Sequence, residues 1–295
     1  MIKFYNRKEK RYEIEKVAAG KFINYLYTNA LGKSFLEIIF KRKFLTFLYG
    51  KYCDSFLSKK RIKPFIEEFG MDMSEYERHA DDYNSFNDFF HRKLKPDFRE
   101  IAMDANTLIS PCDGKLTAID KINEDTTFKV KGFTYSVKDL LKDEKLAKEY
   151  KNGYCLIFRL CPTDYHRFHF IDNGTCSPGK SISGHYYSVN PVALENVNRV
   201  FSENKREYSI LHSENFDDVI YLEVGATFVG SIIQTYNPNA RIQKGEEKGY
   251  FKFGGSTVIL FLKENMVKLD KDLLSNSRNG MESLVRFGEK IGVKA

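Results

Sequence analysis

The residues of this chain that could carry out acid–base or nucleophilic chemistry are an aspartate, two histidines and a serine. They are Asp113, His166, His169 and Ser256. A serine hydroxyl can attack a carbonyl when a nearby base takes its proton, and a carboxylate commonly orients a histidine base. Such a triad is defined by geometry and not by sequence order, so the sequence alone does not show that these side chains meet.

Ser256 follows two glycines and precedes an apolar run. The segment reads Gly254-Gly255-Ser256-Thr257, and residues 258–262 are all apolar. Glycine tolerates backbone conformations that other residues resist, which would let the hydroxyl reach the preceding carbonyl. A strand after Ser256 would then hold the new terminus in place. The pattern fits a chain that cuts itself, and a simple turn before a strand is the alternative.

The two histidines lie three residues apart in Asp164-Tyr165-His166-Arg167-Phe168-His169. Residues at this spacing point to opposite faces of a strand but to one side of a helical turn, and Pro162 is a suitable start for such a turn. Two structural histidines, a metal pair and an acid–base pair all fit. We expect no metal, because HxxH outside a HExxH helix is a weak metal signal.

Asp113 is followed by a glycine, and this pair is typical of a tight turn. Its carboxylate could instead orient a histidine. The elements that would have to position all of these side chains change in character near residue 105.

Before residue 105 the apolar spacing is helical. Large apolar residues recur at intervals of three and four over residues 35–48, and basic clusters stand at 41–43 and 59–63. Such a helix fits an anionic membrane surface, where acyl chains contact the apolar stripe and headgroups attract the basic residues. A helix packed on a protein core with a solvated basic face is the alternative. We expect residues 1–105 to form a helical, basic, membrane-associating region.

After residue 105 the chain is typical of short strands. The segments 154–160, 219–224 and 257–262 are rich in β-branched and aromatic residues, with Gly, Asn and Asp between such runs. No long helical period alternates with them, which favours an antiparallel or mixed sheet over a doubly wound one. The predicted fold class is therefore α+β, with a β-rich catalytic domain over residues 106–295.

Composition narrows the cellular setting. The formal charge is +7, from 47 basic and 40 acidic residues, which favours an anionic partner such as a nucleic acid or a lipid surface. Five cysteines without a CxxC pair predict reduced, buried thiols. The charged N-terminus lacks the apolar core of a secretory signal, and no apolar stretch is long enough to cross a bilayer.

Several blocks, in the same order along the chain, resemble the phosphatidylserine decarboxylases, a family of pyruvoyl-dependent, membrane-associated enzymes. The resemblance runs from about residue 80 to residue 265, and the blocks together are far more specific than any one of them. They are Ser85-Phe86-Asn87-Asp88-Phe89-Phe90 with Arg92, Leu94, Lys95 and Pro96; Asp113-Gly114; residues 164–169; Val189-Asn190-Pro191 with Asn196 and Asn204; Val224-Gly225-Ala226 with residues 229–232; Lys244-Gly245-Glu246 with Gly249, Phe251 and Lys252; and Gly255-Ser256-Thr257.

The resemblance implies that the chain cuts itself. His169, oriented by Asp113, would act as the base while Ser256 Oγ attacks the carbonyl of Gly255. Ser256 would end as a covalent pyruvoyl group, the cofactor. The products would be a β chain of residues 1–255 and an α chain of residues 256–295, associated as a heterodimer.

The resemblance also implies the reaction. Phosphatidylserine would form a Schiff base with the pyruvoyl group, which accepts the electrons left by departing carbon dioxide. His166 would protonate the resulting carbanion, and phosphatidylethanolamine would be released. The enzyme would be a peripheral membrane protein on the cytoplasmic face of the cell membrane. Its partner would be phosphatidylserine in an anionic bilayer and not a nucleic acid, and the resemblance leaves open whether it forms higher oligomers.

One departure and two alternatives accompany this interpretation. The commonest form of the cleavage site in the family is Leu-Gly-Ser-Thr, and Gly254 here should loosen the loop and alter the cleavage rate. A relative acting on a soluble, amino-acid-like substrate would cleave in the same way. A Ser-His-Asp hydrolase is the other alternative, and the absence of a GxSxG elbow disfavours it.

Overall fold

A computed structural model describes residues 3–15, 43–123, 125, 127–130, 133–185, 200–225, 232–254 and 256–295. The part of the apolar pattern at residues 35–42, the resemblance block at residues 189–196 and Gly255 lie outside the described residues. Within the described part, no helix is long and apolar enough to cross a membrane. The five cysteines, all within that part, are free and buried, as predicted.

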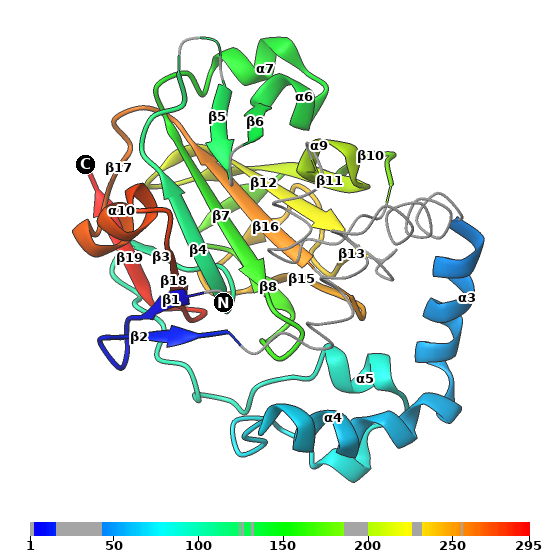
Figure 1. Cartoon of the computed structure of the whole chain (residues 1–295). Coiled ribbons are helices and arrows are strands. Elements are labelled where there is room, and N and C mark those ends of the chain that lie inside the picture. Colours follow the sequence, from blue (N-terminus) through cyan, green and yellow to red (C-terminus); the bar gives the residue numbers. More distant parts are fainter. Residues whose placement is uncertain are drawn as a thin grey trace.

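The described residues are dominated by strands, which confirms the β-rich prediction, and the largest sheet is mixed because one pair of its strands is parallel. The strands of this main sheet are, in spatial order, β14 (Arg241–Ile242), β9 (Gly174–Cys176), β11 (Arg206–Ser213), β12 (Asp217–Gly225), β16 (Ser256–Leu262), β7 (Tyr154–Leu160), β4 (Gly114–Ile119), β18 (Glu282–Val285), β1 (Lys3–Asn6) and β2 (Arg11–Ile14), while β10 (Lys180–Ile182) pairs with β11. Figure 1 shows β12, β16, β7 and β4 running side by side through the centre of the molecule.

Strand β16 lies at the middle of this sheet, and Ser256 is its first residue. Antiparallel pairing places Ser256 opposite Leu160 on one neighbour and Gly225 on the other. All seven residues of β16 are buried, because side chains on both faces of the strand enter a core. A strand buried on both faces needs apolar residues at every position, which is why apolar and polar residues do not alternate over residues 258–262.

A smaller sheet packs on one face of the main sheet. It contains β13 (Ile232–Gln234), β15 (Glu247–Phe251) and β8 (Arg167–His169) in that order. Its residues Phe168 and Phe251 share a buried cluster with Val258 of β16. A fully buried ion pair also joins the two layers, since Lys248 Nζ on β15 lies 2.9 Å from Glu223 Oε1 on β12.

The opposite face of the main sheet is covered by a hairpin and short helices, drawn at the top of Figure 1. These elements are β5 (Thr127–Val130), β6 (Phe133–Ser136), α6 (Val137–Leu141), α7 (Glu144–Lys148) and α9 (Val200–Glu203). At the C-terminal end, β19 (Lys290–Lys294) lies between β17 (Val267–Leu269) and β3 (Thr107–Ile109) and pairs with both. Helix α10 (Lys271–Arg278) packs beside β4 and β18.

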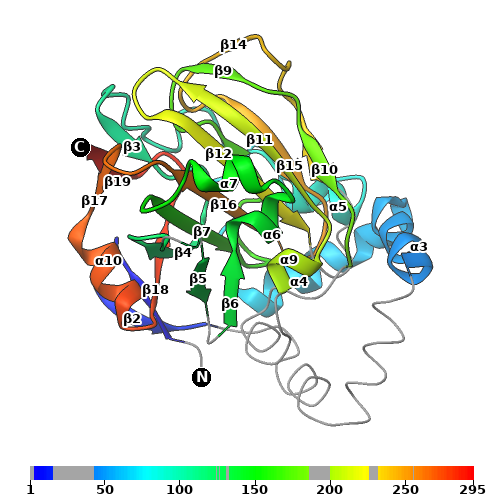
Figure 2. The ribbon, with the colours of Figure 1, turned by 90° about the horizontal axis from the view of Figure 1, so that it is seen from above.

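The helices between residues 43 and 90 gather on one side of the molecule (Figures 1 and 2). They are α3 (Lys43–Asp54), the 3-10 helix η1 (Phe56–Arg61), α4 (Ile62–Phe69), the 3-10 helix η2 (Ala80–Asp82) and α5 (Phe86–Phe90). Buried aromatic side chains of α5, including Phe86 and Phe90, form their small core. Tyr76 pairs with Leu94 in an isolated bridge after α4.

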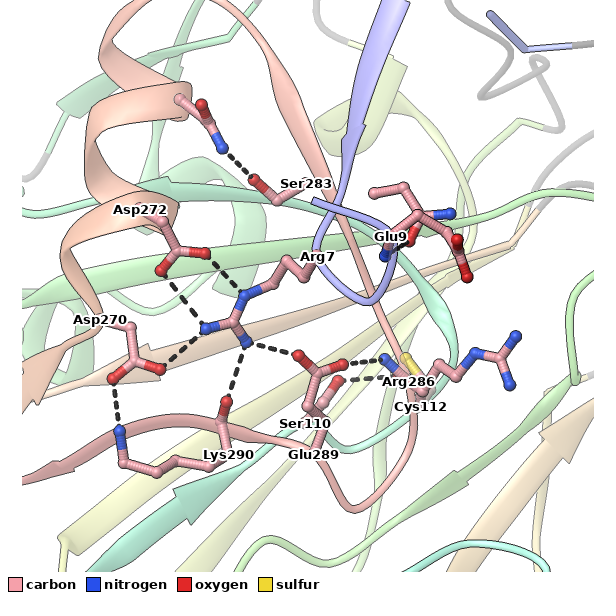
Figure 3. A network of polar contacts seen from close by, with 12 residues as sticks. Arg7, Glu9, Ser110, Cys112, Asp270, Asp272, Ser283, Arg286, Glu289 and Lys290 are labelled. Atoms are coloured by element: carbon pink, nitrogen blue, oxygen red, sulfur yellow. Dashed lines mark hydrogen bonds and ion pairs between the residues drawn. The ribbon is translucent and has the colours of Figure 1, made fainter. Parts of the chain in front are cut away.

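The first residues depart from the helical prediction. Residues 3–14 form the hairpin β1–β2, and β1 pairs in parallel with β18, so this end of the chain is part of the main sheet. The hairpin turn carries Arg7, whose guanidinium contacts Asp270, Asp272 and Glu289 at 2.6–2.9 Å and also the carbonyl of Lys290 (Figure 3). The expectation fails here because contacts with residues near the C-terminus hold this segment as an extended hairpin, and the apolar spacing that predicted helices lies further along the chain, at residues 35–48.

Candidate active site

Ser256 presents a buried hydroxyl to the layer between the two sheets. Residues directly opposite in an antiparallel pair share a face, so the Ser256 side chain shares its face with Leu160 and, two residues on, with Val258. That face carries the smaller sheet. The Ser256 side chain is fully buried, and its Oγ has no hydrogen-bond partner among the described residues. An unpaired buried hydroxyl is costly, so the fold keeps this one in place without satisfying it.

His166 lies just before β8 and its side chain is completely buried. Its Nδ1 is 2.8 Å from the carbonyl oxygen of Asp164, and a carbonyl only accepts, so Nδ1 carries the proton. Nε2 is then unprotonated, and it has no partner among the described residues. The imidazole stacks on Phe90 at 3.8 Å between ring centroids. Phe90 in turn contacts Phe253, which lies three residues before Ser256.

His169, at the end of β8, is held by a different set of groups. Its Nδ1 lies 3.0 Å from the carbonyl oxygen of Gly245, which fixes the proton on Nδ1 by the same reasoning. Its Nε2 therefore accepts the hydroxyl of Tyr165 at 3.1 Å. Phe287 stacks on the imidazole at 3.7 Å between centroids with an interplanar angle of 18°. The ring thus has the tautomer that a general base at Nε2 needs.

Asp113 reaches His169 indirectly. Its Oδ1 accepts the backbone N–H of Phe287 at 2.8 Å, and its Oδ2 accepts Nη2 of Arg99 at 3.1 Å. The Phe287 ring is the group that stacks on His169. Among the described residues no hydrogen bond joins Asp113 to His169, so the carboxylate positions the ring plane through Phe287, while the orienting acceptor is the Gly245 carbonyl.

The helical turn that would bring both histidines to one side does not form. A turn does form at residues 161–164, where the Asp164 carboxylate accepts the N–H of Cys161, but His169 lies in an extended strand. Strand β8 pairs with β15, and this ladder overrides the local helical spacing. The two rings consequently pack against different aromatic partners.

Burial sets the charge state of the site. Desolvation lowers the pKa of His166 to about 3 and that of His169 to about 4, so both rings are neutral at pH 7. The nearby Arg92 guanidinium adds to the effect at His166. Desolvation raises the pKa of Asp113, and the charge of Arg99 opposes that rise.

A polar cavity of about 510 Å³ adjoins the site. Asp113 and Asp164 line it, and these residues position His169 and His166 respectively. Lys115 and Cys161 line the same cavity, with Nζ and Sγ 2.9 Å apart. Its size is within the range of small-molecule sites, about 300–1,000 Å³.

Several positioning residues were not found from the sequence. Gly245 was noted only as part of a resemblance block, and Tyr165 only as a residue between two histidines. Phe287 and Arg99 had no signal at all, because Phe287 is 174 positions from the aspartate it contacts. The positive φ of Gly245, 82°, is the physical reason for glycine there, and it is visible only in the folded chain.

Comparisons with known proteins identify the family of this chain. The family model for phosphatidylserine decarboxylase matches residues 86–293. Three similar relatives are phosphatidylserine decarboxylase proenzymes, and each matches 100% of this chain over 294 residues. The proteins of Clostridium perfringens (strain SM101 / Type A) and Clostridium botulinum (strain Kyoto / Type A2) are 55% and 57% identical to it, and the match covers 100% of each. The protein of Clostridium tetani (strain Massachusetts / E88) is 55% identical, and the match covers 99% of it. This chain therefore belongs to the phosphatidylserine decarboxylase family.

Proposed function

We propose that this carboxy-lyase is made as a proenzyme that cuts itself between Gly255 and Ser256 and then converts phosphatidylserine to phosphatidylethanolamine and carbon dioxide. The observation that carries the proposal is the buried Ser256 hydroxyl, without a hydrogen-bond partner among the described residues, at the first position of a central strand. A hydroxyl held in that way is available to react with the carbonyl that precedes it.

In the first step Ser256 Oγ attacks the carbonyl carbon of Gly255, and the peptide C–N bond breaks to leave an ester. His169 Nε2 takes the hydroxyl proton and returns it to the freed nitrogen. The Nδ1–H bond to Gly245 fixes the required tautomer. Tyr165 must release Nε2 for this step, because its hydroxyl now donates to that atom.

In the second step the ester is eliminated. The α proton of Ser256 leaves to a base and the Gly255 carboxylate departs, giving dehydroalanine at residue 256. Addition of water and loss of ammonia then give the pyruvoyl terminus. Asp113 supports the first step, in which His169 is the base, by holding Phe287 against that ring.

The residues around position 256 fit a pyruvoyl group. The orphaned Ser256 oxygen lies in a buried layer, and His166 Nε2 is a second buried polar atom that lacks a partner in the described part of the chain. When present, a pyruvoyl group would supply the carbonyl electron sink that ordinary side chains lack. We propose His166 as the group that delivers a proton to the substrate carbon, since an anionic substrate beside it would raise its pKa.

The two pieces should stay together after cleavage. Strand β16 is hydrogen-bonded on both sides, to β12 and to β7, and each neighbour belongs to the 1–255 piece. Parallel pairing of β1 with β18 and the ion pairs of Arg7 add contacts at the far end of the 256–295 piece. These contacts support a heterodimer of β and α chains.

A diacyl substrate stays in the bilayer, so the enzyme must bring its site to the membrane surface. We propose peripheral association with the cytoplasmic face of the membrane through the basic, helical region before residue 105, with anionic phosphatidylserine attracting it. The net charge of +7 supports this electrostatic attraction.

The test is the mass of the denatured protein. Wild type should give two species cut between Gly255 and Ser256. The smaller should be lighter by one ammonia than the unmodified peptide of residues 256–295, because a ketone replaces its amine. Ser256→Ala should fold, remain whole and produce no phosphatidylethanolamine. A wild-type protein that stays uncut at neutral pH with phosphatidylserine vesicles present would contradict the proposal.

A further inference from the structure

The most exposed large apolar side chains in the described residues are adjacent. Phe56 and Leu57, in the 3-10 helix η1, are 72% and 68% exposed. Together they form a projecting tip between α3 and α4, which we call the η1 tip. Single exposed apolar residues are common on protein surfaces, but two adjacent large ones at a turn mark a contact site.

The exposure of the η1 tip is fixed by its backbone. Ser58, the next residue, is completely buried, and its Oγ lies 2.7 Å from the carbonyl of Ser55 and 3.0 Å from that of Cys53. The same oxygen accepts the backbone N–H of Phe86 at 2.9 Å. Ile62 is also buried. With both flanks anchored, Phe56 and Leu57 cannot turn into the core without breaking these contacts.

Basic residues surround the η1 tip. Residues 51–63 contain five basic side chains and one acidic side chain, and Lys51, Lys60 and Lys63 are exposed. The acidic residue, Asp54, is already paired with Lys252 at 3.0 Å. Lys63 pairs with Asp81, but both side chains are more than half exposed, so solvent weakens that pair.

We infer that the η1 tip docks on an anionic bilayer, with Phe56 and Leu57 entering the boundary between headgroups and acyl chains and Lys51, Lys60 and Lys63 contacting lipid headgroups. The inference rests on the proposed lipid substrate. Two apolar side chains are too few for a stable protein interface, which needs about 800 Å² on each partner. They suit a bilayer, where a small apolar insertion and a basic rim act together.

The position of the η1 tip relative to the site strengthens this assignment. Ser58 is hydrogen-bonded to Phe86 at the start of α5, and Phe90 at the end of that helix stacks on His166. Helix α5 has only five residues, so the tip and the proposed proton donor are connected through one helical turn. The η1 tip therefore belongs to the helical unit that packs against the imidazole of His166.

The test compares two double variants of the whole protein. Phe56→Ser with Leu57→Ser removes the η1 tip, and Phe98→Ser with Met103→Ser is the control, because those side chains are 41% and 61% exposed elsewhere. Binding is measured by flotation with vesicles of phosphatidylcholine containing phosphatidylserine. The tip variant should bind at least about tenfold more weakly than wild type, and the control should bind like wild type.

Charge is tested separately. Changing Lys51, Lys60 and Lys63 to Gln should abolish most of the difference between phosphatidylserine-containing and neutral vesicles, and salt should have less effect on this variant than on wild type. Self-cleavage, read from the denatured mass, should stay complete in every variant. Turnover of a short-chain, monomeric phosphatidylserine should be unchanged, while turnover of bilayer substrate falls with the tip variant.

Equal vesicle binding by wild type and the tip variant would overturn the inference. So would a tip variant that binds vesicles normally but loses self-association in sedimentation, because the η1 tip would then contact a second copy of the chain. Failure of wild type to cleave or to turn over the short-chain substrate would instead refute the proposed function. The vesicle-binding comparison would still test the η1 tip in that case, because it depends on neither cleavage nor turnover.

Discussion

Gly245 provides the sharpest test of how His169 is oriented, and the variant is Gly245→Ala. The backbone of Gly245 has a φ of +82°, and a Cβ added there would lie 2.8 Å from Cδ1 of Ile101. An L-residue at such a φ costs about 1–2 kcal/mol, and overpacking adds about 1–3 kcal/mol. We therefore expect Gly245→Ala to lose about 2–5 kcal/mol of unfolding free energy.

The same substitution should slow self-cleavage. The loop carrying Gly245 is fixed by two backbone hydrogen bonds with Phe170, so relief of the contact must move either Ile101 or the carbonyl that holds His169. A displacement of about 1 Å in a positioned group can cost about 100-fold in rate. We expect cleavage to slow by about 10- to 100-fold, measured as the fraction of uncut chain against time after synthesis.

Gly280→Ala is the matched control. Gly280 has a φ of +71°, and a Cβ there would meet nothing within 4 Å, so this variant has the backbone strain without the contact. It should lose about 1–2 kcal/mol in urea denaturation and cleave at the wild-type rate. Adding Ile101→Val to Gly245→Ala removes the contacted methyl and should recover most of the cleavage rate. If Gly245→Ala cleaves as fast as Gly280→Ala, the Gly245 carbonyl does not orient His169.

Three further expectations concern stability and pH. His91, His166 and His169 have pKa values lowered to about 4, 3 and 4 by burial, so their stability contribution is complete above the unfolded pKa near 6.5 and is lost as the pH falls toward those values. Wild type should therefore lose unfolding free energy when the pH falls from 7.5 to 5.5, and His91→Gln should lose about 1.3 kcal/mol less over the same range in urea titrations. An equal loss in both proteins would contradict this assignment. Glu15 accepts both nitrogens of Arg159 at 2.7 and 3.1 Å, and its pKa is lowered to about 2 despite desolvation. The ionised carboxylate therefore stabilises the fold fully above pH 4.5, and this stabilisation is lost as the pH falls toward 2. Glu15→Gln should lower the free energy of unfolding by about 3 kcal/mol at pH 7 and by only about 1 kcal/mol at pH 3. An equal decrease at both pH values would refute the ion pair. Arg7→Leu leaves three carboxylates facing one another and should lower the urea midpoint by an amount equivalent to about 2–4 kcal/mol, whereas Arg11→Leu, whose pair with Glu13 is exposed, should change it little.

The sequence by itself determined the chemistry and the class of fold. The blocks from Ser85 to Thr257 indicated the family, and the apolar run after Ser256 predicted the strand that begins at this residue. These signals are local: a side-chain type, a short spacing or a period of apolar residues is complete within a few positions of the chain. The helical spacing before residue 105 was equally local, and of the described residues there, 43–54, 62–69 and 86–90 form helices α3, α4 and α5, while residues 3–6 and 11–14 form strands.

Only the tertiary structure decided which groups hold the candidate catalytic side chains. The first residues pair with a strand near the C-terminus, β8 forms a ladder with β15 and not a helical turn, and Asp113 contacts the backbone of Phe287. The free energy of such contacts depends on which distant segments become neighbours. A backbone N–H is present in every residue except proline, so the residue type at position 287 does not indicate that its N–H binds a carboxylate. The Gly245 carbonyl is the clearest case, because any residue has a carbonyl and only the fold aims this one at His169.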